Sequence, residues 1–381
     1  MKQIPPVDLT RQYKLIEEET DLAVLNILKS GRYIGGEAIA TFEREFADYV
    51  GVTQCVSCNS GTDALFLALR ALNIGAGDEV ITTSFSFFAT AEVISRVGAK
   101  PIFIDINFDT FNLNLNQIEQ AITNRTKAIM PVHLFGQPVN MDKLGAIAKA
   151  HNLYIIEDCA QATGACWGQN KIGSVGHVGC FSFFPTKNLG ACGDGGAVTT
   201  NDETIAKQIR ILKEHGSPSR YRHDFIGINS RIDAVQAVIL TIKLRYLDYW
   251  NQQRQKAAFY YQELLHSVSS LKLPQNLVGG DSVWNQYTVA VAARRSLSTE
   301  SLLVRDLVKQ QLQEQGIISM IYYPIPLHLQ PVYQDLGYKK GQLPVVEQAA
   351  QEVLSLPMFP GISEAEQEQV AYALKDCLIE I

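Results

Sequence analysis

Residues 154–165 read YIIEDCAQATGA, an apolar run that ends at the acidic Asp158 and continues into small and polar residues. A short apolar run bounded in this way is typical of a buried strand. The same pattern recurs towards the N-terminus, in Val56–Cys58, Glu79–Thr82, Ile102–Ile106 and Ala128–Leu134. The stretches between these runs carry apolar residues at helical spacing, as in Thr62–Leu72, Ala89–Val97 and Met141–His151. This alternation predicts an α/β domain with a largely parallel sheet between helices.

The C-terminal part of the chain has a different pattern. Few helix-breaking residues occur between positions 233 and 266, which predicts one long helix that links two lobes. A polar stretch at Pro274–Ser282 then precedes a predicted strand at Val283–Val291 and a helix near Thr299–Gln315. Because 381 residues exceed what one core usually supports, we expect two domains. These are a large α/β domain that includes the N-terminal segment, residues 1–245, and a small α+β domain, residues 246–381.

The composition excludes several classes of protein. With 46% hydrophobic and 19% charged residues the chain is an ordinary globular protein, and a net charge of −6 without a basic block argues against a nucleic-acid partner. The start MKQIPPVDLT lacks the features of a secretory signal, and no apolar run is long enough to span a membrane. The sequence therefore predicts a cytoplasmic protein.

The seven cysteines are scattered and odd in number, which argues against a disulfide framework. Cys55 and Cys58 form a C-x-x-C motif, but no second ligand pair follows at the spacing of a zinc site. Both lie in an apolar run, so we expect two buried core thiols. No other cluster suggests a metal.

Four short segments carry groups that suggest chemistry, and ligands of α/β sheets bind at the carboxyl ends of the strands. Residues 59–62, Asn-Ser-Gly-Thr, lie between a strand and a helix, where backbone N–H groups beside a glycine can bind an anion. The alternative is a Ser/Thr cap of an ordinary helix.

Asp158 closes its strand, so its carboxylate is expected at the same edge of the sheet. There it could bind a cationic ring nitrogen and keep that nitrogen protonated. Gln161 could reach a neighbouring ring hydroxyl, and the small Ala160 would let a flat ring lie against the chain. The alternative is an aspartate that caps the next turn, which leaves Ala160 and Gln161 unexplained.

Lys187 follows a phenylalanine-rich strand and Pro185, and a run of glycines comes after it. This is an unusual place for a solvated lysine, and desolvation would lower its pKa and make the amine nucleophilic. Ser182 could donate to the same anion as Thr62. The glycines do not form a P-loop or a dinucleotide fingerprint. Phe87 or Phe88, at another strand end, could stack on a flat ring, although core packing is an equally ordinary role for either.

Taken together, NSGTDAL, EDCAQATGA, FSFFPTKNLGACGDGGAV, GINSRIDAVQAVIL and YYPIPLH resemble the DegT/StrS family of sugar aminotransferases, which use pyridoxal 5'-phosphate (PLP). The resemblance runs nearly end to end, from IPPVDLTRQY to LSLPMFP. It implies the type I fold of PLP-dependent transferases and a homodimer with active sites shared between the subunits.

The resemblance also implies a role for individual residues. Lys187 would form the Schiff base with PLP and Asp158 would pair with the pyridine nitrogen, with Gln161 on the ring hydroxyl and Ala160 beneath the ring. The phosphate would be held by Gly61, Thr62, Ser182 and, from the partner subunit, Asn229. Phe87 fits the stacking position better than Phe88. The residues that match the sugar-nucleotide pocket of the family are Arg231, Tyr322 and His328.

A lysine at position 187 favours amino transfer, because one branch of the family carries histidine there and dehydrates sugars instead. The reaction that the resemblance implies moves an amino group from an amino acid, L-glutamate by the family pattern, to a keto sugar on UDP or dTDP, for amino-sugar and polysaccharide biosynthesis. The segments 215–231, 284–289 and 322–331 look closest to enzymes of 3-keto UDP-sugars, uronates included, which favours carbon 3 over carbon 4. His328 departs from the uronate pattern. Two other classes stay open: a regulatory protein of the same fold that only binds ligand, and a dehydrogenase, for which the dinucleotide fingerprint is missing.

Overall fold

The computed structural model describes residues 3–292 and 303–380, and its centre is a seven-stranded sheet. The strands follow the order β1-β9-β8-β5-β4-β2-β3, and every neighbouring pair that excludes β9 is parallel. Only β9 runs against its neighbours β1 and β8. The predicted α/β fold with a mainly parallel sheet is therefore confirmed. The strands are β1 (Gln54–Cys58), β2 (Glu79–Thr83), β3 (Lys100–Ile104), β4 (Thr126–Met130), β5 (Tyr154–Asp158), β8 (Val178–Ser182) and β9 (Gly196–Thr200).

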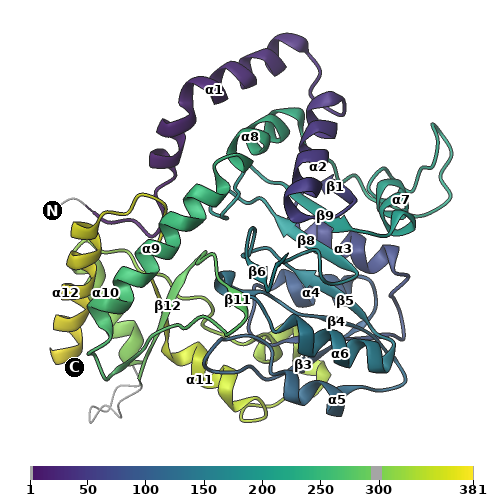
Figure 1. Cartoon of the computed structure of the whole chain (residues 1–381). Coiled ribbons are helices and arrows are strands. Elements are labelled where there is room, and N and C mark those ends of the chain that lie inside the picture. The colour runs from purple at the N-terminus through teal and green to yellow at the C-terminus, as the bar shows by residue number, and fades with distance from the viewer. Residues whose placement is uncertain (1–2, 293–302, 381) are drawn as a thin grey trace.

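Helices cover both faces of this sheet (Figure 1). Consecutive residues of one strand face opposite cores, as Ile155 and Ile156 of β5 do, so both faces are apolar as a parallel sheet requires. One core lies under α2 (Glu37–Val50), α6 (Met141–His151) and α8 (Ala234–Leu244), and the other under α3 (Gly61–Ala71), α4 (Ala89–Arg96) and α7 (Glu203–Leu212). The other elements of this lobe are α1 (Leu9–Ser30), α5 (Ile118–Ala121) and the 3₁₀ turns η1 (Leu115–Gln117) and η2 (Leu134–Gly136).

Polar caps determine where several of these helices begin. Ser60 accepts a hydrogen bond from Asp63 N at the start of α3, and Asn140 does the same for Lys143 N at the start of α6. Asp202 accepts from Thr204 N and Ile205 N at the start of α7. Such caps satisfy N–H groups that have no partner within the helix.

A smaller lobe lies at the other end of the molecule, around a three-stranded sheet of order β10-β12-β13. Its elements are α9 (Leu247–Leu265), β10 (Leu271–Lys272), β12 (Tyr287–Val291), α10 (Val304–Glu314), η3 (Leu327–Leu329), η4 (Pro331–Leu336), α11 (Pro344–Glu352), β13 (Val353–Leu356) and α12 (Glu364–Glu380). A third small sheet joins β6 (Cys166–Trp167), β7 (Asn170–Lys171) and β11 (Gly280–Asp281). Ile4 pairs with Ile317 and lies in the core of the small lobe. A boundary between residues 245 and 246 stays a prediction.

Two predicted elements differ from the structure. The single long helix over residues 233–266 is wrong, because α8 ends and α9 begins around Arg245 and Tyr246. There the backbone hydrogen bonds reach back three residues instead of four, and Arg245 pairs with Glu19 of α1. The predicted strand at 283–291 is shorter, since Trp284 has a positive φ of 47° and pairing begins at Tyr287. The first part of the helix predicted near 299–315 lies outside the described residues.

The structure also bears on the cysteines and on the expected absence of a membrane span. Cys55 and Cys58 are both buried in β1, which confirms them as core residues, and burial raises the pKa of both thiols. Within the described ranges, none of the helices combines the length and the apolar character needed to cross a membrane.

Candidate active site

The segments singled out in the sequence meet at one edge of the central sheet (Figure 1). Asp158 is the last residue of β5 and Ser182 the last of β8, and both strands end at the same edge because they run parallel. Ser182 lies opposite Gly196 of β9, which in turn lies opposite Cys58 at the end of β1. The start of α3 therefore lies beside the ends of β8 and β5, the edge at which such folds bind ligands.

The beginning of α3 packs so closely on the sheet that only glycine fits. A Cβ at Gly61 would lie 2.6 Å from Ser182 Cβ, and one at Gly196 would lie 2.4 Å from the Ser60 carbonyl carbon. Ser60 is the N-cap, which confirms that alternative for this residue. The cap uses the N–H of Asp63, and the N–H groups of Gly61 and Thr62 stand at the open end of the helix. The Ser182 hydroxyl lies next to Gly61, 3.1 Å from the position that a Cβ would take there. This arrangement is suited to a phosphate.

Asp158 is a buried carboxylate held from two sides. Its Oδ2 accepts a hydrogen bond of 2.9 Å from Thr90 Oγ1, and its Oδ1 accepts one of 3.2 Å from Ala160 N. The second bond shows that Asp158 also caps the following turn. Burial raises the pKa of Asp158, while Thr90, the Ala160 N–H and the positive charge of Lys187 oppose that rise. A cation next to the carboxylate would therefore keep it ionised.

Lys187 lies in a turn after β8 in which its own N–H donates to Phe184 O at 2.9 Å. The side chain is only partly open to solvent. Protein packed around the amine lowers the pKa of Lys187 to about 8, and the nearby Asp158 carboxylate acts in the opposite direction. About one tenth of the amine is therefore neutral and nucleophilic at pH 7, far more than for a lysine with an ordinary pKa.

Gln161 has a fixed orientation beside this pair. Its Oε1 accepts a 2.7 Å hydrogen bond from Phe135 N, so its Nε2 must point the other way, where it donates to Tyr323 Oη at 3.2 Å. One N–H of the amide then remains for an acceptor on the ligand side. Ala160, the residue before Gln161, is partly exposed as expected for a surface on which a ring can lie.

The two candidate stacking residues have different surroundings. Phe87 is 60% exposed and its ring centroid lies 6.5 Å from that of Tyr323. Phe88 packs into the core with its ring 5.8 Å from Tyr333. The geometry therefore favours Phe87 as the aromatic side chain that is free to cover a ligand.

The three residues predicted to line the sugar pocket differ in their burial and in their hydrogen-bond partners. Tyr322 is partly exposed, and burial raises its pKa. Arg231 Nη1 already pairs with Glu214 Oε2 at 2.8 Å. His328 is buried, with Nδ1 2.7 Å from Ser84 Oγ and Nε2 3.3 Å from Glu347 Oε1. Because both ring nitrogens of His328 have protein partners, a direct contact with a sugar finds no support in this geometry.

Asn229 lies on the surface, one residue before a contact with the start of α3. It is exposed, and its backbone forms a bridge with Glu214 at the base of a projecting segment. The next residue, Ser230, is buried and donates a 2.8 Å hydrogen bond to Asp63 Oδ2. The exposed position leaves Asn229 open to a second molecule.

The sequence reasoning missed three residues around the site. Thr90 binds Asp158 directly, and Ser86 Oγ lies 2.8 Å from Thr90 Oγ1, so Ser86 donates to Thr90. Tyr323, rather than its neighbour Tyr322, contacts Gln161. The tyrosine pair at 322 and 323 marks this position in the sequence, but the sequence does not show which of the two contacts Gln161.

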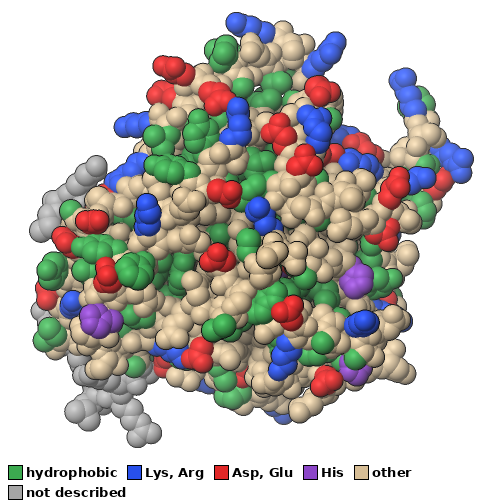
Figure 2. Space-filling model, viewed as in Figure 1, with side chains coloured by type: hydrophobic (Ala, Val, Ile, Leu, Met, Phe, Trp, Pro, Cys, Tyr) green, Lys and Arg blue, Asp and Glu red, His purple; other side chains and the backbone are tan. Residues whose placement is uncertain are grey.

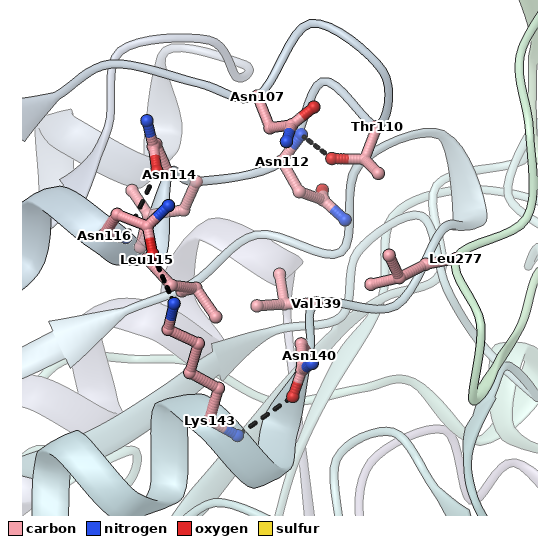
Figure 3. Close-up of a pocket in the computed structure, with 11 residues that line it drawn as sticks. Asn107, Thr110, Asn112, Asn114, Leu115, Asn116, Val139, Asn140, Lys143 and Leu277 are labelled. Carbon is pink, nitrogen blue, oxygen red and sulfur yellow. Dashed lines mark hydrogen bonds between the residues drawn. The ribbon is translucent and has the colours of Figure 1, made fainter.

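The described residues also contain a cavity of about 150 Å³ that none of the predicted site residues lines (Figure 3). Asparagine side chains and Lys143 surround it. Three of these oxygens already have partners. Asn140 Oδ1 caps α6 by accepting from Lys143 N, Asn114 Oδ1 caps η1 by accepting from Asn116 N, and Asn116 Oδ1 accepts from Lys143 Nζ. These bonds explain why asparagine occurs here, at the starts of α6 and η1.

A buried group of His133, Glu157 and Cys159 has the side-chain types of a metal site. However, His133 Nδ1 accepts from Val139 N, which leaves Nε2 as the donor to Glu157 at 3.0 Å. Glu157 also accepts hydrogen bonds from backbone N–H groups of residues 173, 175 and 176. With these positions in use, the group anchors the 173–176 segment to β5.

The sequence profile of the DegT/DnrJ/EryC1/StrS aminotransferase family matches residues 14–375. This chain belongs to that family. The match confirms the resemblance predicted from the motifs, and it covers both lobes.

Individual relatives align over nearly their whole length. The chain is 46% identical over 369 residues to a protein named pleiotropic regulatory protein from Geobacillus stearothermophilus, which covers 96% of each chain. It is 44% identical over 375 residues to a UDP-N-acetyl-3-dehydro-alpha-D-glucosamine 3-aminotransferase from Acidithiobacillus ferrooxidans, which covers 98% of each. The solved structure of DesV from S. venezuelae, in complex with a ketimine intermediate, superposes with a TM-score of 0.93 at 40% identity, covering 99% of this chain and 98% of DesV. Other relatives are named transaminases of dTDP-linked 3-amino sugars or of a UDP-linked 3-oxo-glucuronate.

The predicted type I fold is confirmed, and the protein is an aminotransferase whose family and solved relatives indicate PLP as the cofactor. The residues present fit that group. A tight glycine cradle with helix N–H groups suits its phosphate, a buried carboxylate suits its ring nitrogen, and a lysine with a lowered pKa suits its aldehyde.

Proposed function

We propose that this protein transfers an amino group from L-glutamate to carbon 3 of a keto sugar carried by UDP or dTDP, as a homodimer with shared active sites. The observation that carries the proposal is the position of Lys187, whose pKa is about 8, near enough to the buried Asp158 at the carboxyl edge of the sheet for each charge to act on the other. The products are an amino sugar for polysaccharide or glycan biosynthesis and 2-oxoglutarate.

Each residue of the site has a definite task in this reaction. When bound, PLP supplies an aldehyde that condenses with amines and a ring that accepts electrons. Asp158 holds a proton at the ring nitrogen, because a carboxylate next to that nitrogen favours its charged form. Lys187 Nζ would accept a proton from the α-carbon of the amino donor and give it back at the other end of the same conjugated system, a role for which a pKa near 8 is suitable.

The surrounding residues bind and orient. The N–H groups of Gly61 and Thr62 and the hydroxyl of Ser182 hold the phosphate at the start of α3. The remaining N–H of Gln161 points to the ring hydroxyl, while Phe87 covers one face of the ring and Ala160 leaves room on the other.

We further propose a neutral sugar rather than a uronate. Arg231 is the residue that the sequence suggested for a sugar carboxylate, but Glu214 lies 2.8 Å from its guanidinium. A second carboxylate would have to displace Glu214 or lie beside it, and like charges at this distance repel. The name of the Acidithiobacillus ferrooxidans relative describes a neutral N-acetylated sugar and amination at carbon 3.

The homodimer is supported by apolar surface on the long helix α1. Leu15, Leu22, Leu25 and Leu28 are exposed on this helix, which extends as an arm at the top of the molecule (Figure 1). A mostly apolar groove of about 370 Å³ lies between α1, α2 and α8. An arm of this kind is expected to cover, and be covered by, a second copy of the chain.

A second projection supports sharing of the site. The segment after α7 extends away from the body, and Figure 2 shows hydrophobic and basic side chains on it. Tyr221 is 84% and Ile226 86% exposed. Asn229 lies at the base of this segment, where it can reach the phosphate site of a second subunit.

The first test is the absorbance spectrum of the purified protein with PLP, before and after L-glutamate. The expected result is a visible band that glutamate converts to the shorter-wavelength band of the amine form of the cofactor. Lys187→Ala is the control, and it should bind PLP without the visible band. Screening UDP- and dTDP-linked 3-keto and 4-keto sugars, neutral and uronate, then identifies the acceptor. A protein that takes up PLP but does not respond to amino acids would contradict amino transfer and favour the ligand-binding regulatory alternative, which the name of the Geobacillus stearothermophilus relative also suggests.

A further inference from the structure

Three buried asparagines form a chain of hydrogen bonds directly behind Lys187. Asn251 of α9 donates to Thr163 O at 3.1 Å, Asn188 donates to Asn251 Oδ1 at 2.7 Å, and Asn285 donates to Asn188 Oδ1 at 2.8 Å. Each of the three side chains is at most 5% exposed. The chain joins the Lys187 turn to α9 and to the segment that leads into the sheet of the small lobe.

The backbone fixes the orientation of each amide in this chain. Asn251 must direct its NH₂ group at the Thr163 carbonyl, so its oxygen faces Asn188. Asn188 must direct its own NH₂ group at that oxygen and at Val283 O, 2.9 Å away, so its oxygen faces Asn285. Asn285 is therefore required as a donor, and no residue that can only accept could replace it.

Asn285 holds the residues on both sides of Lys187. One of its N–H groups reaches the side chain of Asn188, and the other reaches Thr186 O at a longer distance of 3.4 Å. Asn285 Oδ1 has no partner among the described residues. If the amide were flipped, its oxygen would face two other acceptors, Asn188 Oδ1 and Thr186 O, and would form no hydrogen bond with either. The orientation is therefore determined by the Lys187 turn.

Asn285 is itself held firmly from the small lobe. Arg254 is buried, and its Nη1 donates to the carbonyls of Trp284, Asn285 and Met358 at 3.1–3.3 Å. On the other side, the segment contacts η2 so closely that a Cβ at Gly136 would lie 2.9 Å from Asn285 N. A side chain held in this way can transmit the position of the small lobe to the lysine turn.

We propose that Asn285 is a positioning residue of the amino-transfer reaction, which fixes the place and direction of the Lys187 amine by holding Thr186 and Asn188. The inference rests on the proposed function for its kinetic consequence, although its effect on Lys187 itself does not require turnover. Rigid placement of a reacting group commonly changes rates by orders of magnitude, and so a loosened turn should slow proton transfer more than it weakens binding.

The test begins with the protein free of cofactor, in which acetic anhydride labels neutral amines and mass spectrometry follows Lys187 across pH. Wild type should show a midpoint near its pKa of about 8. In Asn285→Ala the loosened turn admits water, so the midpoint rises, and a rise of one unit lowers labelling at pH 8 about fivefold. Asn285→Leu keeps the volume without the donors and serves if the alanine variant does not fold. The matched control is Gln255→Ala, which removes an amide bound to Ser282 O in the same segment.

The kinetic arm uses the holoenzyme in a single turnover with L-glutamate. Asn285→Ala and Asn285→Leu should slow this half-reaction about 100-fold with little change in the glutamate concentration for half-saturation. Gln255→Ala should match wild type in both arms. Wild-type labelling midpoints and rates within twofold of wild type in folded Asn285 variants would overturn the positioning role. If instead wild type itself fails to react with glutamate, the proposed function fails, and the labelling arm still decides whether Asn285 controls Lys187.

Discussion

Thr90 Oγ1 donates a 2.9 Å hydrogen bond to Asp158 Oδ2, and this bond opposes the effect of burial on the carboxylate. Burial alone raises the pKa of Asp158, and the hydrogen bond from Thr90 is the largest contribution that lowers it. Thr90 is the second residue of α4 and follows Phe87 by three positions, so one short segment carries both the exposed aromatic ring and the hydroxyl that stabilises the Asp158 charge.

The variant Thr90→Val keeps the shape of the side chain and removes this bond. The pKa of Asp158 should rise further, so the carboxylate is protonated up to a higher pH. We expect the acidic limb of the kcat/KM profile to move up by about one pH unit, so that activity falls by up to about tenfold at pH values below the wild-type limb and by less above it. Thr90→Ser retains a hydroxyl and should lie near wild type. An unchanged acidic limb in Thr90→Val would contradict the role of Thr90.

Gly61→Ala tests the cradle at the start of α3. The new Cβ would lie 2.6 Å from Ser182 Cβ, too close for two carbon atoms, so the helix must move away from β8. We expect PLP to bind about 100-fold more weakly, since helix N–H groups bind phosphate only at short range. Equilibrium dialysis or fluorescence titration measures the change. Gly145→Ala in α6, where the structure has open space, should leave PLP affinity unchanged and stabilise the fold by up to about 1 kcal/mol.

The sequence predicted the parts of the site that lie within one strand and the turn after it. Asp158 ends an apolar run, and Lys187 follows another, so local patterns were enough to place both at the carboxyl edge. The resemblance to a family added the roles. Such patterns depend only on neighbouring residues, so they predict correctly a side chain whose position is set by the strand directly before it.

Contacts between distant segments could not be predicted in the same way. Thr90 meets Asp158 across 68 positions, Asn285 meets Asn188 across 97 and Gln161 meets Tyr323 across 162. The break between α8 and α9 contains neither proline nor glycine, and it coincides with the pairing of Arg245 and Glu19. His328 matched a family position, but only the structure shows both its nitrogens in use.

Glu366 provides a test of stability against pH. Arg11 of α1 donates to Glu366 of α12, 2.9 Å between Nη1 and Oε2, and lowers the pKa of Glu366 from 4.5 to about 2. A carboxylate with a depressed pKa stabilises the fold above its unfolded pKa and loses that effect as pH falls from 4.5 towards 2. Because both side chains are partly exposed, we expect Glu366→Gln to lower the free energy of unfolding by only about 1 kcal/mol at pH 7.

This difference between wild type and Glu366→Gln should shrink as the pH of urea unfolding is lowered from 5 to 3. Glu364→Gln is the matched control, since Glu364 is exposed in the first turn of the same helix. It should change stability by a few tenths of a kcal/mol at most. A loss in Glu366→Gln that stays constant with pH would show that the carboxylate charge is not its source.

The shared site can be tested by mixing two inactive variants. If the proposed shared site is correct, Lys187→Ala removes the amine from a subunit's own site, whereas Asn229→Ala removes a phosphate contact from the site of the neighbouring subunit. In a heterodimer one site keeps both groups, so random mixing should restore about one quarter of wild-type activity. Lys187→Ala mixed with Asp158→Asn is the control, because both residues belong to one subunit's cluster and neither site of that heterodimer is complete. Heterodimers verified by differential tagging that show no more activity than this control would mean that Asn229 does not act across an interface. Restored activity only in the first mixture would establish both the dimer and the direction in which the projecting segment reaches.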